Sequence, residues 1–294
     1  MRLTGIVLNT FRETVRRPFY FVLVATAVAA LVTTLRLPLF TFGSDTDMYK
    51  DLGLSFILVF VLLMALLASA TSVASEVEDR TALTVLSKAV GRGQFVLGTY
   101  LGVMAAVLVA VTVLGVVFMA AVYYRVRLDA GVLERAYTHG GIGAQVEAFR
   151  QKQFGQALTV MPGLALVILQ VGVLAAVATA VSTRLSPAAS VGVSLGVCLV
   201  GHLTVFLEAG LRGSAGAGQL ARQGVLAVVP FLEIFNLNEK LSHAMLTPLA
   251  AGSAGAAEWR AVWEYVGWSG LYALAYVVFA IGLGALLFRR RSLG

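Results

Sequence analysis

Few residues in this sequence could do chemistry, and the first to stand out is a serine flanked by glycines. Residues 192–196 read Gly-Val-Ser-Leu-Gly, which matches the GxSxG pattern of serine hydrolases. That pattern presents a nucleophile only on a strained turn between a strand and a helix. Here it lies inside a long apolar run, where Gly192 and Gly196 would instead let a neighbouring helix approach closely. We interpret them as a helix-packing face and predict no catalytic residue.

Nucleotide and metal chemistry are also missing from the sequence. A phosphate-binding loop of the GxxxxGK[ST] type needs a lysine directly after a glycine, and none of the four lysines follows one. The histidines at positions 139, 202 and 243 lie far apart, without the spacing of a metal site. We expect this chain to bind no metal and no cofactor of its own.

The clearest charged feature is a compact segment between two uncharged stretches. Residues 75–80, Ser-Glu-Val-Glu-Asp-Arg, place four charges within five positions. Ser75 can cap a helix that begins at the next residue, and Glu78 can complete a capping box with it. Gly91 and Gly93 would then end this helix before the next apolar run. We predict a short amphipathic helix followed by a glycine hinge.

The composition places this charged segment in a membrane protein. The 294-residue chain is 59% hydrophobic and 13% charged, whereas soluble domains are close to half apolar and a quarter charged. Its single cysteine, Cys198, excludes an intrachain disulfide. The net charge of +7 comes from basic residues at the ends of apolar runs. That position is typical of membrane topology signals, so we expect no nucleic-acid partner.

Six apolar runs are long enough to cross a hydrocarbon core of about 30 Å, which takes about 20 residues. The predicted fold is therefore an all-α integral membrane protein with one six-helix domain, residues 19–288. The expected spans are about 19–39, 52–75, 95–123, 162–183, 188–207 and 265–288. They are joined by a hairpin at 76–94 and by longer, partly helical loops at 124–161 and 208–264, with a tail at 289–294.

Ionisable groups are scarce in these predicted spans. The second, third, fourth and sixth carry none, the fifth holds only His202, and Arg36 lies near the end of the first. Proton- and ion-coupled transporters need such groups along their pathways. We therefore expect the chain not to energise transport by itself.

The arginines and lysines orient the spans. About half of the 22 basic residues fall in one set of short segments. These segments are the two termini, residues 76–94 and residues 184–187. The loops at 124–161 and 208–264 hold a similar number over more than twice the length. The positive-inside rule then predicts that both termini and the 76–94 hairpin are cytoplasmic.

Two further segments are predicted to lie at the membrane surface. Residues 1–18 have apolar positions at helical spacing and are expected to form an amphipathic helix on the inner face, with its arginines near lipid phosphates. Residues 224–235 are too short to span and contain a proline, so we predict an interfacial or re-entrant element. A helix is also expected around residues 144–158 in the first outer loop.

The charged segment resembles the cytoplasmic loop of ABC-2 type transporter permeases. The family pattern is matched here by Glu76, Glu78, Arg80, Thr81, Leu86, Ser87, Lys88, Val90, Arg92, Phe95, Gly98, Leu101 and Gly102. Three positions depart from it, where Ala89 replaces a proline, Gly91 a small hydroxyl residue and Thr99 a lysine. The N-terminal helix, the six spans, the 230–237 segment and the 288–293 tail are similar to the six-span branch, which includes permeases associated with multicopper-enzyme maturation and gliding motility.

The resemblance implies the permease subunit of an ATP-driven exporter in the bacterial inner membrane, without enzymatic activity of its own. A cytoplasmic ABC ATPase would hold ATP and Mg, and a second permease copy would pair with this chain through Gly192 and Gly196. Docking of the ATPase would involve Glu76, Glu78, Asp79, Arg80, Thr81, Ser87, Lys88 and Arg92, braced by Arg12, Arg16 and Arg17.

Two other functions remain open from the sequence. One is a non-transporting membrane scaffold whose outer loops anchor periplasmic proteins, and the other is a passive channel. An associated nucleotide-binding subunit would separate the exporter from the scaffold. No feature of the outer loops identifies a cargo, and no cluster of methionine or histidine there indicates copper.

Overall fold

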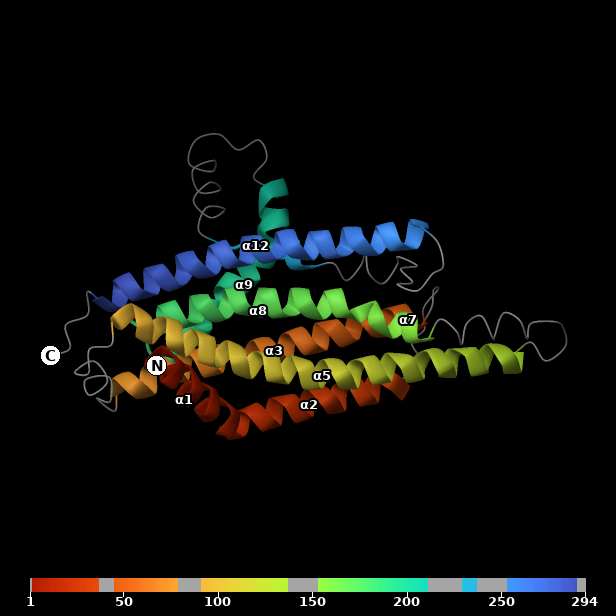
Figure 1. Ribbon diagram of the computed structural model, residues 1–294, viewed down its shortest axis with the longest axis horizontal. Coiled ribbons are helices and arrows are strands. Elements are labelled where there is room, and N and C mark those ends of the chain that lie inside the picture. Colours follow the sequence, from red (N-terminus) through yellow and green to blue (C-terminus); the bar gives the residue numbers. More distant parts are fainter. Residues whose placement is uncertain are drawn as a thin grey trace.

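A computed structural model of the chain describes residues 2–36, 45–78, 91–136, 153–210, 229–236 and 253–289. Within these ranges every regular element is a helix, and the long helices lie side by side in one bundle (Figure 1). The helices are α1 (Arg2–Arg16), α2 (Pro18–Arg36), α3 (Asp45–Glu78), α5 (Arg92–Ala136), α7 (Gln153–Leu158), α8 (Val160–Ser182), α9 (Pro187–Gly210), the 3₁₀ helix η1 (Leu232–Phe235) and α12 (Ser253–Arg289).

Six of these helices are long and apolar enough to cross a membrane, which confirms the predicted all-helical, multi-pass class. They are α2, α3, α5, α8, α9 and α12. Three are much longer than predicted, because α3 begins at Asp45, α5 continues to Ala136 and α12 begins at Ser253. The hydropathy pattern ends a span at its first charges, but a helix continues until its backbone meets a breaker. None of the three extensions contains a proline.

The predicted start of a new helix at Ser75 is wrong. Helix α3 runs without interruption through Glu78, so Ser75 lies within its last turns rather than at the start of a helix. Residues 70–78 contain no glycine or proline. Extending an existing helix costs much less free energy than nucleating another. The chain therefore continues α3 although Ser75 carries a local capping signal. Residues 79–90, the rest of the predicted hairpin helix, lie outside the described residues.

Helix α8 is the centre of the bundle. It packs against α3, α5, α9 and α12, and it is the most enclosed of the six spanning helices, whereas α2 and α9 are the least. Small residues allow this central position: a side-chain carbon at Gly284 of α12 would lie 2.9 Å from the backbone of Ala180. The tight α8–α12 packing thus depends on the absence of a side chain at that position.

Helix α1 forms over nearly the predicted range and ends in a bend before α2, which starts at Pro18. Proline suits the first position of a helix because its missing N–H needs no partner there. One face of α1 packs along α5, where Gly98 and Gly102 face it. A side-chain carbon at Gly98 would lie 2.8 Å from Ile6, and one at Gly102 would lie 2.8 Å from the backbone oxygen of Val7.

Gly98 and Gly102 therefore allow the backbones of α5 and α1 to approach each other closely. We expect Gly102→Ala to lower the free energy of unfolding by about 1–3 kcal/mol through overpacking, despite the helix propensity gained, about 1 kcal/mol. Thermal unfolding of the purified chain in detergent, followed by tryptophan fluorescence, measures this change.

Gly282→Ala in α12 is the matched control, because no described atom outside its own helix lies within 4 Å of the added carbon. It should leave the melting temperature unchanged or slightly raised. A Gly102→Ala variant as stable as the Gly282→Ala variant would contradict the close packing of α1 on α5.

Candidate functional site

The candidate site is the junction where α1 lies against α3 and α5, here named the α1 junction. It lies at the end of the bundle where α3 finishes at Glu78 and α5 begins at Arg92 (Figure 1). Residues 79–90 connect these two helix ends. The α1 junction therefore adjoins the segment that the sequence predicts to dock an ATPase.

The predicted docking residues divide into two groups. Glu76 and Glu78 belong to the last turn of α3, and Arg92 is the first residue of α5. The rest, Asp79, Arg80, Thr81, Ser87 and Lys88, lie outside the described residues. Their assignment stays a prediction, anchored at both ends by helices of the bundle.

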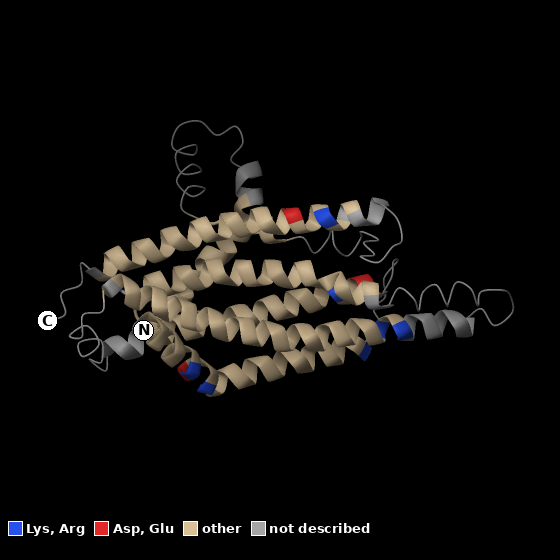
Figure 2. Cartoon of the chain, in the orientation of Figure 1, with Lys and Arg blue, Asp and Glu red and all other residues tan. Residues whose placement is uncertain are grey.

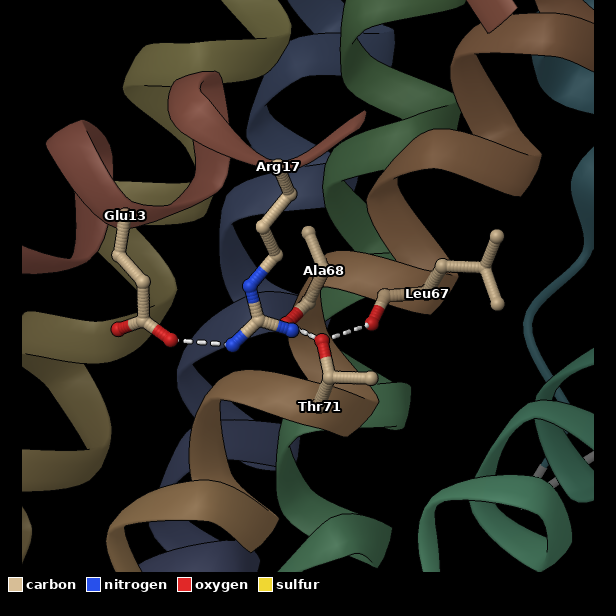
Figure 3. A network of polar contacts seen from close by, with 5 residues as sticks. All are labelled: Glu13, Arg17, Leu67, Ala68 and Thr71. Atoms are coloured by element: carbon tan, nitrogen blue, oxygen red, sulfur yellow. Dashed lines mark hydrogen bonds and ion pairs between the residues drawn. The ribbon is translucent and has the colours of Figure 1, made fainter. Parts of the chain in front are cut away.

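Arg17 connects the bend after α1 to the bundle. Its guanidinium forms an ion pair with Glu13 one turn earlier and points toward Thr71 on α3 (Figure 3). The Thr71 hydroxyl donates to the carbonyl oxygen of Leu67 at 2.6 Å. Arg17 thus lies between α1 and α3, and this orientation favours an internal role over the predicted bracing of a partner.

Arg12 and Arg16 point the other way. Both are exposed on the outer side of α1, whereas Thr10 and Thr14 on the inner side are fully buried. The consecutive arginines Arg16 and Arg17 therefore have different environments. The sequence grouped them as one basic set, but only Arg12 and Arg16 are free to meet a lipid or another protein.

The buried face of the α1 junction holds hydroxyl groups without hydrogen bonds. Among the described residues, the side-chain oxygens of Thr10 and Thr14 on the inner side of α1 are buried and have no bonded partner. An unsatisfied buried polar group costs about 1–3 kcal/mol. Packing rather than hydrogen bonding therefore holds α1 in place. Residue spacing does not indicate this, since threonine on an amphipathic helix suits either face.

The same end of the bundle is closed by contacts among α5, α8 and α12. The rings of Phe95 and Phe288 stack with centroids 5.9 Å apart, joining the start of α5 to the end of α12. The Arg184 side chain, in the turn after α8, donates to the carbonyl oxygen of Leu287 at 3.0 Å. Arg184 thus satisfies a free carbonyl at the end of α12, besides contributing to the predicted topology signal.

A second polar cluster lies at the opposite end of the bundle, beyond the predicted ends of the second and third spans. Lys50 is buried and bonds to Asp47 at 3.2 Å and to Gln156 of α7, which lies within the helix predicted around residues 144–158. Arg125 is also buried and donates to the carbonyl oxygen of Leu35, in the last turn of α2, at 2.6 Å. Both side chains belong to the helical extensions of α3 and α5, whereas the predicted spans 52–75 and 95–123 themselves carry no charged residue. Figure 2 shows the charges gathered at the two ends of the bundle.

One ionisable side chain lies deeper in the bundle. The Nε2 atom of His202 on α9 lies 3.1 Å from the side-chain amide nitrogen of Gln170 on α8. Its Nδ1 atom is 2.9 Å from the carbonyl oxygen of Cys198. A neutral ring satisfies both contacts if Nδ1–H donates to the carbonyl and Nε2 accepts from the amide. His202 therefore joins α9 to α8, and the buried Gln170 is the partner that sequence spacing could not identify.

The short helix η1 inserts next to this contact. It packs against α8 and α9, and Leu232 lies against Gly201. The backbone N–H of Phe231 donates to the Tyr272 hydroxyl, and the Tyr265 hydroxyl donates to the carbonyl oxygen of Ile234, both at 2.8 Å. Non-helical backbone within a membrane needs such partners. The structure describes residues 229–235 of the segment 224–235, for which an interfacial or re-entrant element was predicted, and the choice between the two stays a prediction.

The glycine pair of α9 faces away from the part of the bundle that the structure describes. A side-chain carbon at Gly192 or Gly196 would meet no described atom within 4 Å outside its own helix. Helix α9 instead buries Ser190 and Ser194. The predicted packing of these glycines against a helix of a second copy stays a prediction.

Comparison with known proteins identifies no relative: no family model and no curated protein matches this chain. The described residues also contain no group of three or more histidine, cysteine, aspartate or glutamate side chains that could hold a metal ion. The geometry of the α1 junction is therefore the basis on which a function is proposed.

The Glu13–Arg17 pair can be measured by a double-mutant cycle. The two side chains are 32% and 22% exposed, so the pair is partly screened by solvent, and we expect a coupling free energy of about 0.5–1 kcal/mol. The variants Glu13→Gln, Arg17→Gln and the double variant are compared by thermal unfolding. The same cycle with Arg16→Gln should give a coupling near zero, and equal coupling for both arginines would contradict the inward orientation of Arg17.

The buried Arg125 should matter more than its exposed neighbour. Arg125→Gln removes the charged side chain of α5 that donates to the Leu35 carbonyl in the last turn of α2. We expect this change to lower the free energy of unfolding by about 1.5–3 kcal/mol. Arg127→Gln removes the same charge two residues later, where the side chain is exposed, and should cost less than about 0.5 kcal/mol. Denaturant unfolding in detergent that gives equal costs would contradict a structural role for Arg125.

Proposed function

We propose that this chain is the permease subunit of an ATP-driven exporter. In this proposal, a separate cytoplasmic ATPase docks on the segment that connects α3 to α5 and moves these helices when it binds and hydrolyses ATP. The chain itself contributes no chemistry. The proposal rests on the resemblance of residues 75–102 to the coupling loop of ABC-2 permeases and on the arrangement of the α1 junction.

The observation that carries the proposal is the position of α1 across the two helices that flank the docking segment. Helix α1 packs on Gly98 and Gly102 of α5, and Arg17 reaches toward Thr71 of α3. Movement of the docking segment would therefore be transmitted to α1, α3 and α5 together.

The distribution of polar groups also supports an external energy source. Charged side chains of the described residues lie toward the two ends of the bundle (Figure 2). Between them, His202 is paired with Gln170 and with a backbone carbonyl, and the described spans offer no chain of carboxylates for a proton relay. The sequence has no phosphate-binding loop either. Energy for transport would have to come from a partner subunit.

The exporter proposal predicts that charge reversal in the docking segment abolishes association with the ATPase. The tagged full-length chain is purified in mild detergent from the membranes of its native host, and co-purifying nucleotide-binding protein and ATP hydrolysis are quantified. We expect an equimolar ATPase with the wild-type chain. We expect at least about tenfold less with Glu78→Lys/Arg80→Glu, since an unpaired interfacial charge costs about 2–5 kcal/mol.

A matched control reverses one acid and one base at the opposite end of the bundle. Arg260 and Glu264 of α12 are both exposed, so Arg260→Glu/Glu264→Lys should leave the ATPase bound. Retention of an equimolar ATPase by Glu78→Lys/Arg80→Glu would contradict the docking assignment. Absence of any ATPase from the wild-type preparation would favour the membrane scaffold.

A further inference from the structure

The outer side of α1 carries two arginines, Arg12 and Arg16, which are one turn apart and exposed. Neither forms an ion pair with the acidic side chains of the described residues. Glu13, the acid of α1, is engaged by Arg17. Like charges four residues apart on a helix repel each other. An anion that contacts both guanidinium groups would remove this repulsion.

Exposed apolar side chains precede and follow these arginines along the chain. Helix α2 starts at Pro18, and its first two turns leave Phe21 and Val22 about three-fifths exposed, at 59% and 61%. On α1 itself, Leu8 is 47% exposed one turn before Arg12. The bend between the two helices thus combines a double positive charge with apolar side chains at the start of the first spanning helix (Figure 2).

This combination matches the two parts of an anionic phospholipid. Guanidinium groups bind phosphate oxygens in a bidentate manner, and long arginine side chains reach the headgroup region from the edge of an apolar surface. Acyl chains would cover Phe21 and Val22. An acidic protein surface would satisfy the arginines equally well but would leave no reason for the large apolar side chains beside them.

We propose that Arg12 and Arg16 form a binding site for the phosphate of an anionic phospholipid whose acyl chains lie along the first turn of α2. Arg17 takes no part, because it is turned inward and paired with Glu13. The site fixes the bend between α1 and α2 at the membrane surface. It does not depend on the proposed exporter function, because lipid binding requires no ATPase.

The test titrates the full-length chain in a neutral detergent with phosphatidylglycerol or phosphatidylcholine and counts bound lipids by native mass spectrometry. We expect the wild-type chain to prefer phosphatidylglycerol. Arg12→Gln/Arg16→Gln should reduce that preference about tenfold or more, because each basic residue near the surface contributes about 1 kcal/mol. Arg36→Gln/Arg127→Gln, which removes two exposed arginines at the opposite end, should keep it. Melting temperatures confirm that all variants are folded.

Three results would overturn the proposal. The first is an unchanged phosphatidylglycerol preference in Arg12→Gln/Arg16→Gln, and the second is an equal loss in the control variant, which would indicate general charge attraction. The third is displacement of the lipid by millimolar inorganic phosphate, which would indicate a site for soluble phosphate. Loss of a co-purifying ATPase with unchanged lipid preference would assign the two arginines to a protein contact and would also exclude the lipid site.

Discussion

The close contact between α1 and α5 is the constraint on which the account depends. Without side chains at Gly98 and Gly102, the backbone of α1 approaches α5 so closely that one added carbon would meet the carbonyl oxygen of Val7. This contact turns an amphipathic N-terminal segment into a part of the bundle. It also fixes the direction of the remaining α1 side chains, with Thr10 and Thr14 inward, Arg17 toward α3, and Arg12 and Arg16 outward.

A second constraint is the need to satisfy polar groups in an apolar environment. Arg125 and Arg184 each donate to a carbonyl near the end of another helix, Leu35 of α2 and Leu287 of α12. Around η1, the Tyr265 hydroxyl donates to the carbonyl oxygen of Ile234, and the Tyr272 hydroxyl accepts from the backbone N–H of Phe231. Helix ends and irregular backbone are costly in a membrane unless they find such partners. Basic side chains that look like topology signals in the sequence therefore also join neighbouring helices.

Much of the fold could be predicted from the sequence, because membrane insertion depends on the length and polarity of apolar runs. The six spans and the N-terminal helix are near their predicted places. Helix ends were less predictable. Ser75 carries a capping signal, but α3 continues through it. Lys50 was expected in a loop, but it belongs to α3 and bonds to Gln156, which is distant in the sequence. Pairing between helices depends on three-dimensional packing, so the Gln170–His202 contact and the inward turn of Arg17 could not be read from spacing alone.

The account is tested most directly by linking α1 to α5 through engineered cysteines. In a Cys198→Ala background, Ile6→Cys and Gly98→Cys place two thiols at positions whose side-chain carbons lie about 3.0 Å apart, close to the separation of about 3.5–4.5 Å found in disulfides. Oxidation in native membranes should give a nearly complete, reducible link within each chain, and the pair Ile6→Cys and Gly192→Cys should give none. Folded protein that forms no Ile6–Gly98 link would contradict the docking of α1 on α5, and with it the transmission of force through the α1 junction.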